Sequence, residues 1–155
     1  MREKPMVIFC TIPVIQEKRG QATKTERLSE AHEAMSLLGL NYDTLNILDE
    51  ELTEENLTAA LKTLVPLYES VYAPAIEGYQ KQHDLIGKVA GALWDDVTHY
   101  MTYTKEDLHT KGPTVITPTQ DEKDLKNKML DCYQSQIKIN APHFVAVRNL
   151  PEYYA

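Results

Sequence analysis

The chain of 155 residues has little cysteine, and its two cysteines lie far apart in the sequence. Cys10 and Cys132 therefore form neither a disulfide framework nor a zinc-ligand pair. Cys10 stands in an apolar run, where a buried thiol behaves as a small hydrophobic group. These features favour a chain with reduced thiols, and we expect a cytoplasmic location.

Long hydrophobic runs are also absent from the sequence. The apolar segment from Met6 to Ile12 covers only about seven residues, which is too short for a signal peptide or a membrane span. The hydrophobic fraction of 43% and the charged fraction of 25% are ordinary for a globular protein and exclude a disordered or fibrous chain. We therefore expect a soluble protein that makes no membrane contact.

Positive charge is scarce as well. The 16 Lys and Arg residues are outnumbered by 23 Asp and Glu residues, and the formal net charge is −7. Sequence-independent binding of nucleic acid requires clustered Lys and Arg that neutralise phosphates. The densest basic segment, around Lys18 and Arg19, is short and flanked by acids, so we interpret it as a solvated loop. No nucleic-acid partner is expected.

The motifs of several enzyme classes are missing too. The sequence contains no Gly-x-Ser-x-Gly motif and no glycine-rich phosphate loop. Neither Cys10 nor Cys132 has a sequence neighbour that would lower its pKa. Nucleophilic catalysis and phosphate binding by these motifs are therefore not expected.

What the sequence does contain is an alternation of strand and helix patterns. Short apolar or alternating runs predict strands at Met6–Ile12, Thr44–Leu48, Val71–Ala73, His99–Tyr103 and Phe144–Val147. Helical periodicity predicts helices at about 23–38, 53–65, 83–95 and 119–137. This order predicts one α/β domain over residues 1–155, a three-layer sandwich with a mostly parallel, Rossmann-like sheet.

Helix boundaries are marked by specific residue pairs. Thr23 with Glu26, and Thr119 with Glu122, have the spacing of a capping box, and Gly39 is placed to end the first helix. Within the helix at 83–95, Gly87 and Gly91 lie one turn apart. Each costs roughly 1 kcal/mol of helix propensity, so we expect both to pack closely against a neighbouring segment.

The loop that follows the strand at Val71–Ala73 carries the most chemistry. In open α/β sheets, ligands bind beyond the carboxyl ends of the strands. This loop places Glu77, His83 and Asp84 between a strand end and a helix start. A histidine there can bind a metal ion while a nearby carboxylate orients it. Alternatively, His83 begins the helix and contacts only solvent.

Three segments, in order, resemble the PIG-L/LmbE-like family of metal-dependent N-deacetylases. The segments are Arg27-Leu28-Ser29-Glu30-Ala31, which continues to Leu38-Gly39; Tyr72-Ala73-Pro74, which continues through Glu77-Gly78 to His83-Asp84-Leu85-Ile86-Gly87; and Lys128 with Cys132-Tyr133-Gln134-Ser135-Gln136. The resemblance extends from about Val7 to Gln136. It implies hydrolysis of an acetamide on an amino sugar or a similar compound.

The family resemblance also implies roles for individual residues. Members hold zinc or a similar divalent ion through two histidines and an aspartate, and the ion activates a water molecule. The second histidine of the family's His-x-x-His pair matches His83, which is implied to be a metal ligand. The first matches Gln80, which can hydrogen-bond an oxyanion but lacks the acid–base strength of imidazole. Asp49, Glu77 and Tyr79 are the substrate-binding candidates, although Asp49 also suits an acidic approach to a helix.

The family's opening segment is absent from this sequence. Members begin with a strand and a His-Pro-Asp-Asp-Glu motif that supplies the other metal ligands and the general base, and the chain is truncated relative to them. His83 alone cannot hold a catalytic zinc, which needs about three protein ligands. Asp95, Asp96 and His99 follow an Asp-Asp-x-x-His order, but they lie where a helix ends and a strand begins. We expect the remaining histidines to be structural or surface residues: His32, His109 and His143.

Two functional hypotheses follow. In the first, the chain is a zinc-dependent deacetylase domain that acts on an amide or sugar-like small molecule and needs a partner chain to complete its site. In the second, the scaffold is a non-catalytic module that binds a ligand or a protein. A parallel sheet without its first strand leaves an unpaired edge, so we also expect a homo-oligomer or an obligate partner chain.

Overall fold

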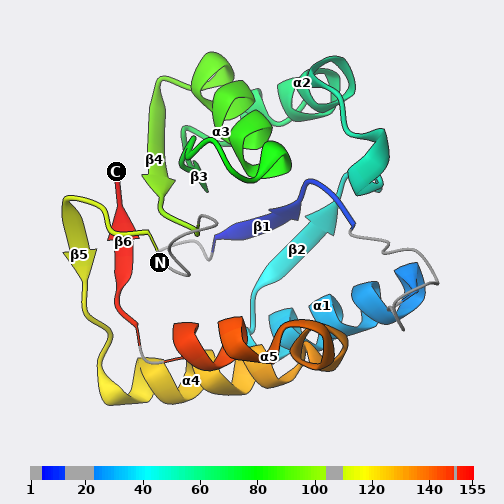
Figure 1. Cartoon of the computed structure of the whole chain (residues 1–155). Helices are drawn as coiled ribbons and strands as arrows, with labels where there is room; N and C mark the ends of the chain where they lie inside the picture. Colours follow the sequence, from blue (N-terminus) through cyan, green and yellow to red (C-terminus); the bar gives the residue numbers. More distant parts are fainter. Residues whose placement is uncertain (1–4, 13–22, 104–109, 149) are drawn as a thin grey trace. The chain divides into compact units, whose positions relative to one another are not determined.

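The structure is a computed structural model that describes residues 5–12, 23–103, 110–148 and 150–155, without the side chains of residues 139–144 and 146 (Figure 1). Its elements form two compact units. Unit 1 is Met1–Glu51 with Thr119–Asn149, and unit 2 is Leu52–Pro118 with Leu150–Ala155. Both units combine helices with parallel strands, which confirms the predicted α/β class.

Unit 1 contains a two-stranded parallel sheet and three helices. Strand β1 (Met6–Phe9) pairs with β2 (Asn41–Thr44), and the helices are α1 (Lys24–Leu38), α4 (Gln120–Asp131) and α5 (Gln134–Val147), with a short 3₁₀ helix η2 (Asp49–Glu51). Ala34, Met35 and Cys132 form its buried core. Side chains from the sheet and the helices pack on this core: Val7, Phe9, Leu38, Leu40, Tyr42, Met129 and Tyr133.

Local sequence explains why α1 begins and ends where it does. The Thr23 hydroxyl accepts from Glu26 N at 3.2 Å, and the Glu26 carboxylate accepts from Thr23 N at 2.6 Å. Hydrogen bonds from the Thr23 backbone, and then from its side chain, lower the pKa of Glu26, so the capping box is strongest when that carboxyl is ionised. Gly39 ends the helix in the left-handed region at φ 61°. The predicted boundaries are confirmed, as is the capping box of Thr119 and Glu122 on α4.

Unit 2 contains a four-stranded sheet in the order β3-β4-β6-β5. Strands β3 (Ser70–Pro74) and β4 (Asp96–Tyr100) are parallel, while β6 (Glu152–Tyr154) pairs antiparallel with β4 and with β5 (Thr114–Ile116). The unit also holds α2 (Glu54–Lys62), a 3₁₀ helix η3 (Val65–Leu67) and α3 (Lys81–Leu93). Helix α3 packs on β3 and β4 and is itself contacted by α2 (Figure 1).

The two glycines of α3 differ in their surroundings. A Cβ atom on Gly87 would lie 2.3 Å from the carbonyl oxygen of Pro74, so the helix approaches the end of β3 more closely than any side chain would allow. For Gly91 the nearest atom to such a Cβ is His99 Nε2, at 4.0 Å. The predicted close packing is confirmed for Gly87 and wrong for Gly91, which is exposed.

Two predicted strands are displaced along the sequence. The strand predicted at Thr44–Leu48 lies instead at Asn41–Thr44, because Asn46 adopts a positive φ of 59° that interrupts extended backbone. Of the predicted strand, Thr44 pairs with Phe9 at the end of β2, and Leu48 forms an isolated bridge to Ile12. The strand predicted at His99–Tyr103 lies at Asp96–Tyr100, which frees residues 101–103 to form a loop at the carboxyl end of β4.

The C-terminal third was predicted least well. The segment Phe144–Val147 lies within α5 and not in a strand. The long helix expected to reach Ile137 is divided at Cys132 and Tyr133 into α4 and α5. Strands β5 and β6 were not predicted; β6 is short and carries two tyrosines, and β5 is only three residues long and exposed.

Neither cysteine is suited to nucleophilic chemistry. Both are free thiols, and burial raises the pKa of the Cys10 thiol to about 11. Burial, followed by the charges of Glu33 and Asp131, also raises the pKa of Cys132. At neutral pH both groups are protonated, and the thiolate is the reactive form.

In the described part of the chain, no helix combines the length and the apolar character needed to cross a membrane.

Candidate functional site at the ends of β3 and β4

The loop between β3 and α3 is shaped by hydrogen bonds to the first turn of the helix. Asp84 Oδ1 accepts from Glu77 N at 2.8 Å and from Gly78 N at 3.1 Å. Gly78 takes a positive φ of 78°, which a glycine adopts without strain. These contacts hold the loop against the start of α3 and fix the direction of the Glu77 side chain.

Glu77 reaches across to the segment that follows β4. Its Oε2 accepts from the backbone N–H of Thr102 at 2.7 Å and from the Thr102 hydroxyl at 2.6 Å. Its Oε1 is buried and has no hydrogen-bond partner among the described residues. A buried carboxylate oxygen without a donor is costly, so a ligand that brings an O–H or N–H group to it would remove that cost. This geometry supports the substrate-binding role expected for Glu77.

His83 lies in the first turn of α3 and is partly buried. Its Nδ1 is 3.3 Å from Thr102 Oγ1, and its ring packs edge-on against Tyr103 with centroids 6.0 Å apart. The alternative in which His83 contacts only solvent is therefore wrong. His83 and Glu77 meet at the same Thr102 hydroxyl.

Gln80 and Tyr79 complete this cluster. Gln80 is the N-cap residue of α3, and its Nε2 donates to the Tyr103 hydroxyl at 3.0 Å. The rings of Tyr79 and Tyr103 are T-shaped with centroids 6.2 Å apart. Burial, and then the charge of Tyr79, raises the pKa of Tyr103, so its hydroxyl is a neutral donor and acceptor at physiological pH.

Asp49 belongs to unit 1, where it begins η2. Its backbone N–H donates to the carbonyl oxygen of Ile12 at 3.4 Å, and its Oδ1 is buried without a partner in the described ranges of the chain. Asp49 thus offers the same kind of acceptor as Glu77. The alternative role of Asp49 is a favourable interaction of its carboxylate with the positive end of a helix dipole. The helix η2 has too few residues to provide such a dipole, so this alternative depends on α2, which follows in the sequence.

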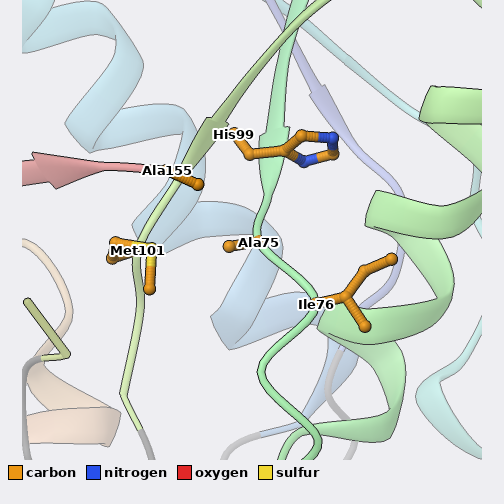
Figure 2. A pocket seen from close by; sticks show the side chains of 5 residues that line it. All are labelled: Ala75, Ile76, His99, Met101 and Ala155. Carbon is orange, nitrogen blue, oxygen red and sulfur yellow. The ribbon is translucent and has the colours of Figure 1, made fainter. Parts of the chain in front are cut away.

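The Asp-Asp-x-x-His order does not produce a metal site. Asp96 and His99 lie three positions apart in β4, so their side chains point to opposite faces of the sheet. His99 Nδ1 is 3.0 Å from the carbonyl oxygen of Pro74, and the ring extends from β4 across β3 (Figure 2). Asp95 is exposed beyond the end of α3.

His99 lines an open, mainly apolar hollow of about 290 Å³ with Ala75, Ile76, Met101 and Ala155 (Figure 2). The polar residues expected to bind substrate or metal do not line it. We therefore place the candidate site at the convergent polar groups around Thr102 and Tyr103 and not at this apolar hollow.

Of the remaining histidines, the structure describes the side chain of His32 alone. His32 is exposed on α1, with Nδ1 3.1 Å from the Tyr42 hydroxyl, as expected for a surface residue. His109 lies outside the described residues, and so does the side chain of His143.

Two of the three segments that carry the family resemblance meet in unit 1. Glu30 on α1 accepts from Ser135 N at 2.6 Å and from Ser135 Oγ at 2.8 Å, which caps the start of α5. Arg27 Nη1 donates to Glu30 at 2.6 Å and to Ser135 at 3.4 Å, and its guanidinium lies 5.4 Å from the centre of the Tyr133 ring. Arg27 and Glu30 are 13% and 12% exposed. This buried cluster fastens α1 to α5.

The described residues do not complete a zinc site by themselves. Among them, no group of three His, Cys, Asp or Glu side chains is close enough to hold a metal ion. A catalytic zinc needs about three protein ligands, and in the family resemblance His83 would be one of them.

The comparisons with known proteins inform the fold. The chain is similar in structure to the conserved protein TT1542 from Thermus thermophilus. The TM-score is 0.70 at 17% sequence identity, and the match covers 98% of this chain and 80% of that chain. No protein-family model matches the sequence, and no curated protein matches it either. At 17% identity the likeness shows a shared fold and nothing about activity.

Sequence reasoning missed two residues of the cluster, Thr102 and Tyr103. Both were assigned to a strand that in fact ends at Tyr100. The rule that ligands bind at the carboxyl ends of parallel strands would have identified them, had the end of β4 been placed correctly. The same rule did identify the loop that carries Glu77, Gln80 and His83.

Proposed function

We propose that this chain is an N-deacetylase-like domain that forms one side of a zinc-dependent amide-hydrolase site. Its ligand would be an amide or sugar-like small molecule bound at the carboxyl ends of β3 and β4. In this proposal His83 is a metal ligand, Gln80 faces the substrate carbonyl, and Glu77 and Tyr79 bind the substrate, while Asp49 of unit 1 is a separate substrate-binding candidate. The fold class proposed for the chain is a three-layer, Rossmann-like sandwich.

The observation that carries the proposal is the convergence of Glu77 and His83 on Thr102. An imidazole, a buried carboxylate oxygen without a partner among the described residues and an amide side chain lie together at the end of two neighbouring parallel strands. This is where ligands bind in open α/β sheets. The contact between Glu30 and Ser135 adds support, because it joins two segments of the family resemblance.

The other metal ligands would come from a second polypeptide. When bound, zinc would supply an activated water and polarise the amide carbonyl. The residues of this chain would supply one ligand to the ion, orient the substrate and exclude bulk water. A partner strand would dock beside β1, which pairs with β2 alone among the described residues.

Acetate release from N-acetylglucosamine-type amides tests whether the chain needs a second polypeptide for activity. We expect the purified chain to release no acetate and to retain well under one zinc per chain after dialysis, because one imidazole binds zinc weakly. Elemental analysis and an enzymatic acetate assay measure both quantities. Stoichiometric zinc together with turnover by the chain alone would show that the site is complete.

Assembly is a second expected property. In the described part of the chain β1 pairs only with β2, and β3 only with β4, so each has one edge without a hydrogen-bonded neighbour, which favours association with another strand. Large apolar side chains are exposed on both strands, with Met6 at 38% and Tyr72 at 70%. We expect a homo-oligomer, or a stable complex with a partner chain, in sedimentation velocity at micromolar concentration. A single monomeric species under those conditions contradicts this expectation.

A non-catalytic ligand-binding module is the second candidate. It is favoured by Gln80, whose amide donates to the Tyr103 hydroxyl and cannot transfer a proton as the family's histidine could. The two candidates differ when the partner chain is present. Acetate release by the complex supports the hydrolase, whereas saturable binding of the amide without release supports the module.

A further inference from the structure

The Thr102 hydroxyl lies between the carboxylate of Glu77 and the imidazole of His83. Its Oγ1 is 2.6 Å from Glu77 Oε2 and 3.3 Å from His83 Nδ1. A hydroxyl has a single hydrogen to donate, and an ionised carboxylate can only accept. The short contact therefore places the Thr102 hydrogen on the side of Glu77.

The direction of that hydrogen determines which tautomer the neutral His83 ring adopts. Because Thr102 Oγ1 donates to Glu77, it can only accept from His83, so Nδ1 must carry the imidazole hydrogen. The lone pair of the neutral ring then lies on Nε2, the nitrogen that would bind a metal ion. In metal sites, a hydrogen bond from the other ring nitrogen commonly selects the ligating nitrogen in this way.

Thr102 and the ring are both held in place by further contacts. The Thr102 backbone N–H donates to the same Glu77 Oε2 at 2.7 Å, so two bonds anchor this residue to one oxygen. The His83 ring meets the Tyr103 ring at an interplanar angle of 86°, which restricts its rotation. The result is a preorganised imidazole.

We propose that Thr102 is a positioning residue that fixes the tautomer and orientation of His83, with Glu77 acting through it. This extends the proposed function by explaining how the chain would present Nε2 to a metal ion. The tautomer itself is a property of the chain without metal or ligand, so it can be tested separately from the proposed function.

The test is long-range ¹H–¹⁵N NMR of the His83 ring in the metal-free chain, at a pH where the ring is neutral. We expect the wild-type ring to carry its hydrogen on Nδ1. Thr102→Val keeps the shape of the side chain but removes the hydroxyl, so the Nε2–H tautomer should become populated. Thr102→Ser retains the hydroxyl and should keep the wild-type tautomer.

Zinc affinity provides a second readout with the same variants. Loss of a group that orients a metal-binding histidine typically weakens binding by about 10- to 100-fold, so Thr102→Val should bind zinc at least about tenfold more weakly than Thr102→Ser. A wild-type ring with its hydrogen on Nε2 overturns the proposal without any variant. An unchanged tautomer in folded Thr102→Val also overturns it. Absence of zinc binding in all proteins would contradict the proposed function while the tautomer result stands.

Discussion

Glu30→Ala is expected to lower the free energy of unfolding by about 3 kcal/mol, since breaking a buried ion pair from one side leaves the other charge uncompensated. Arg27 would lose its acceptor at 2.6 Å, and Ser135 N would lose the carboxylate that caps α5. Arg27 Nε is already buried without a partner among the described residues, so few other acceptors are at hand. Urea denaturation followed by circular dichroism measures the change.

Glu33→Ala is the matched control for this substitution. Glu33 lies one turn along α1 from Glu30 and is exposed, so its removal should change stability by less than about 0.5 kcal/mol. If Glu30→Ala is no more destabilising than Glu33→Ala, then the cluster of Arg27, Glu30 and Ser135 does not fasten α1 to α5.

Gly87→Ala is expected to destabilise the protein by about 2 kcal/mol. The new Cβ would lie 2.3 Å from Pro74 O, and that oxygen is also contacted by His99 Nδ1 at 3.0 Å. Forcing the helix away from β3 costs up to about 3 kcal/mol, of which helix propensity returns about 1 kcal/mol. The same displacement moves the start of α3, and with it His83, relative to Thr102.

Gly91→Ala makes the same chemical change on the same helix without the clash. Its Cβ would have His99 Nε2 at 4.0 Å, an ordinary contact, so the gain in helix propensity should raise stability by about 0.5 to 1 kcal/mol. Thermal unfolding of both variants gives the comparison. Equal effects at the two positions would show that α3 does not pack tightly on the end of β3.

The parts of the fold that could be predicted depend on local interactions. Capping boxes at Thr23 and Thr119 and the stop at Gly39 are encoded within a few residues, so the helix boundaries were predicted well. Strand bounds depend on distant partners and on single backbone conformations such as that of Asn46, so β2 and β4 were displaced from their predicted positions. Strand β6 pairs with β4 and β5 across a large separation in sequence, and no local pattern revealed it.

In the candidate site too, the residues close in sequence could be predicted and the residue distant in sequence could not. Glu77, Gln80 and His83 lie in one loop and the helix it enters, and the strand-end rule identified them from sequence. Thr102 comes from another strand end, and its contacts with Glu77 and His83 span 25 and 19 residues. Sequence alone could place His83 between the end of β3 and the start of α3, but it could not show which group orients the ring.

The central proposal is that His83 presents a metal-binding imidazole at the ends of β3 and β4, and that the described residues offer too few further ligands to hold zinc tightly. Zinc titration followed by NMR of the histidine rings is its most direct test. The account predicts that weak, saturable binding perturbs the His83 Nε2 signal first and that His83→Ala removes this response. Binding that leaves His83 unperturbed, or tight stoichiometric binding by the chain alone, would contradict it.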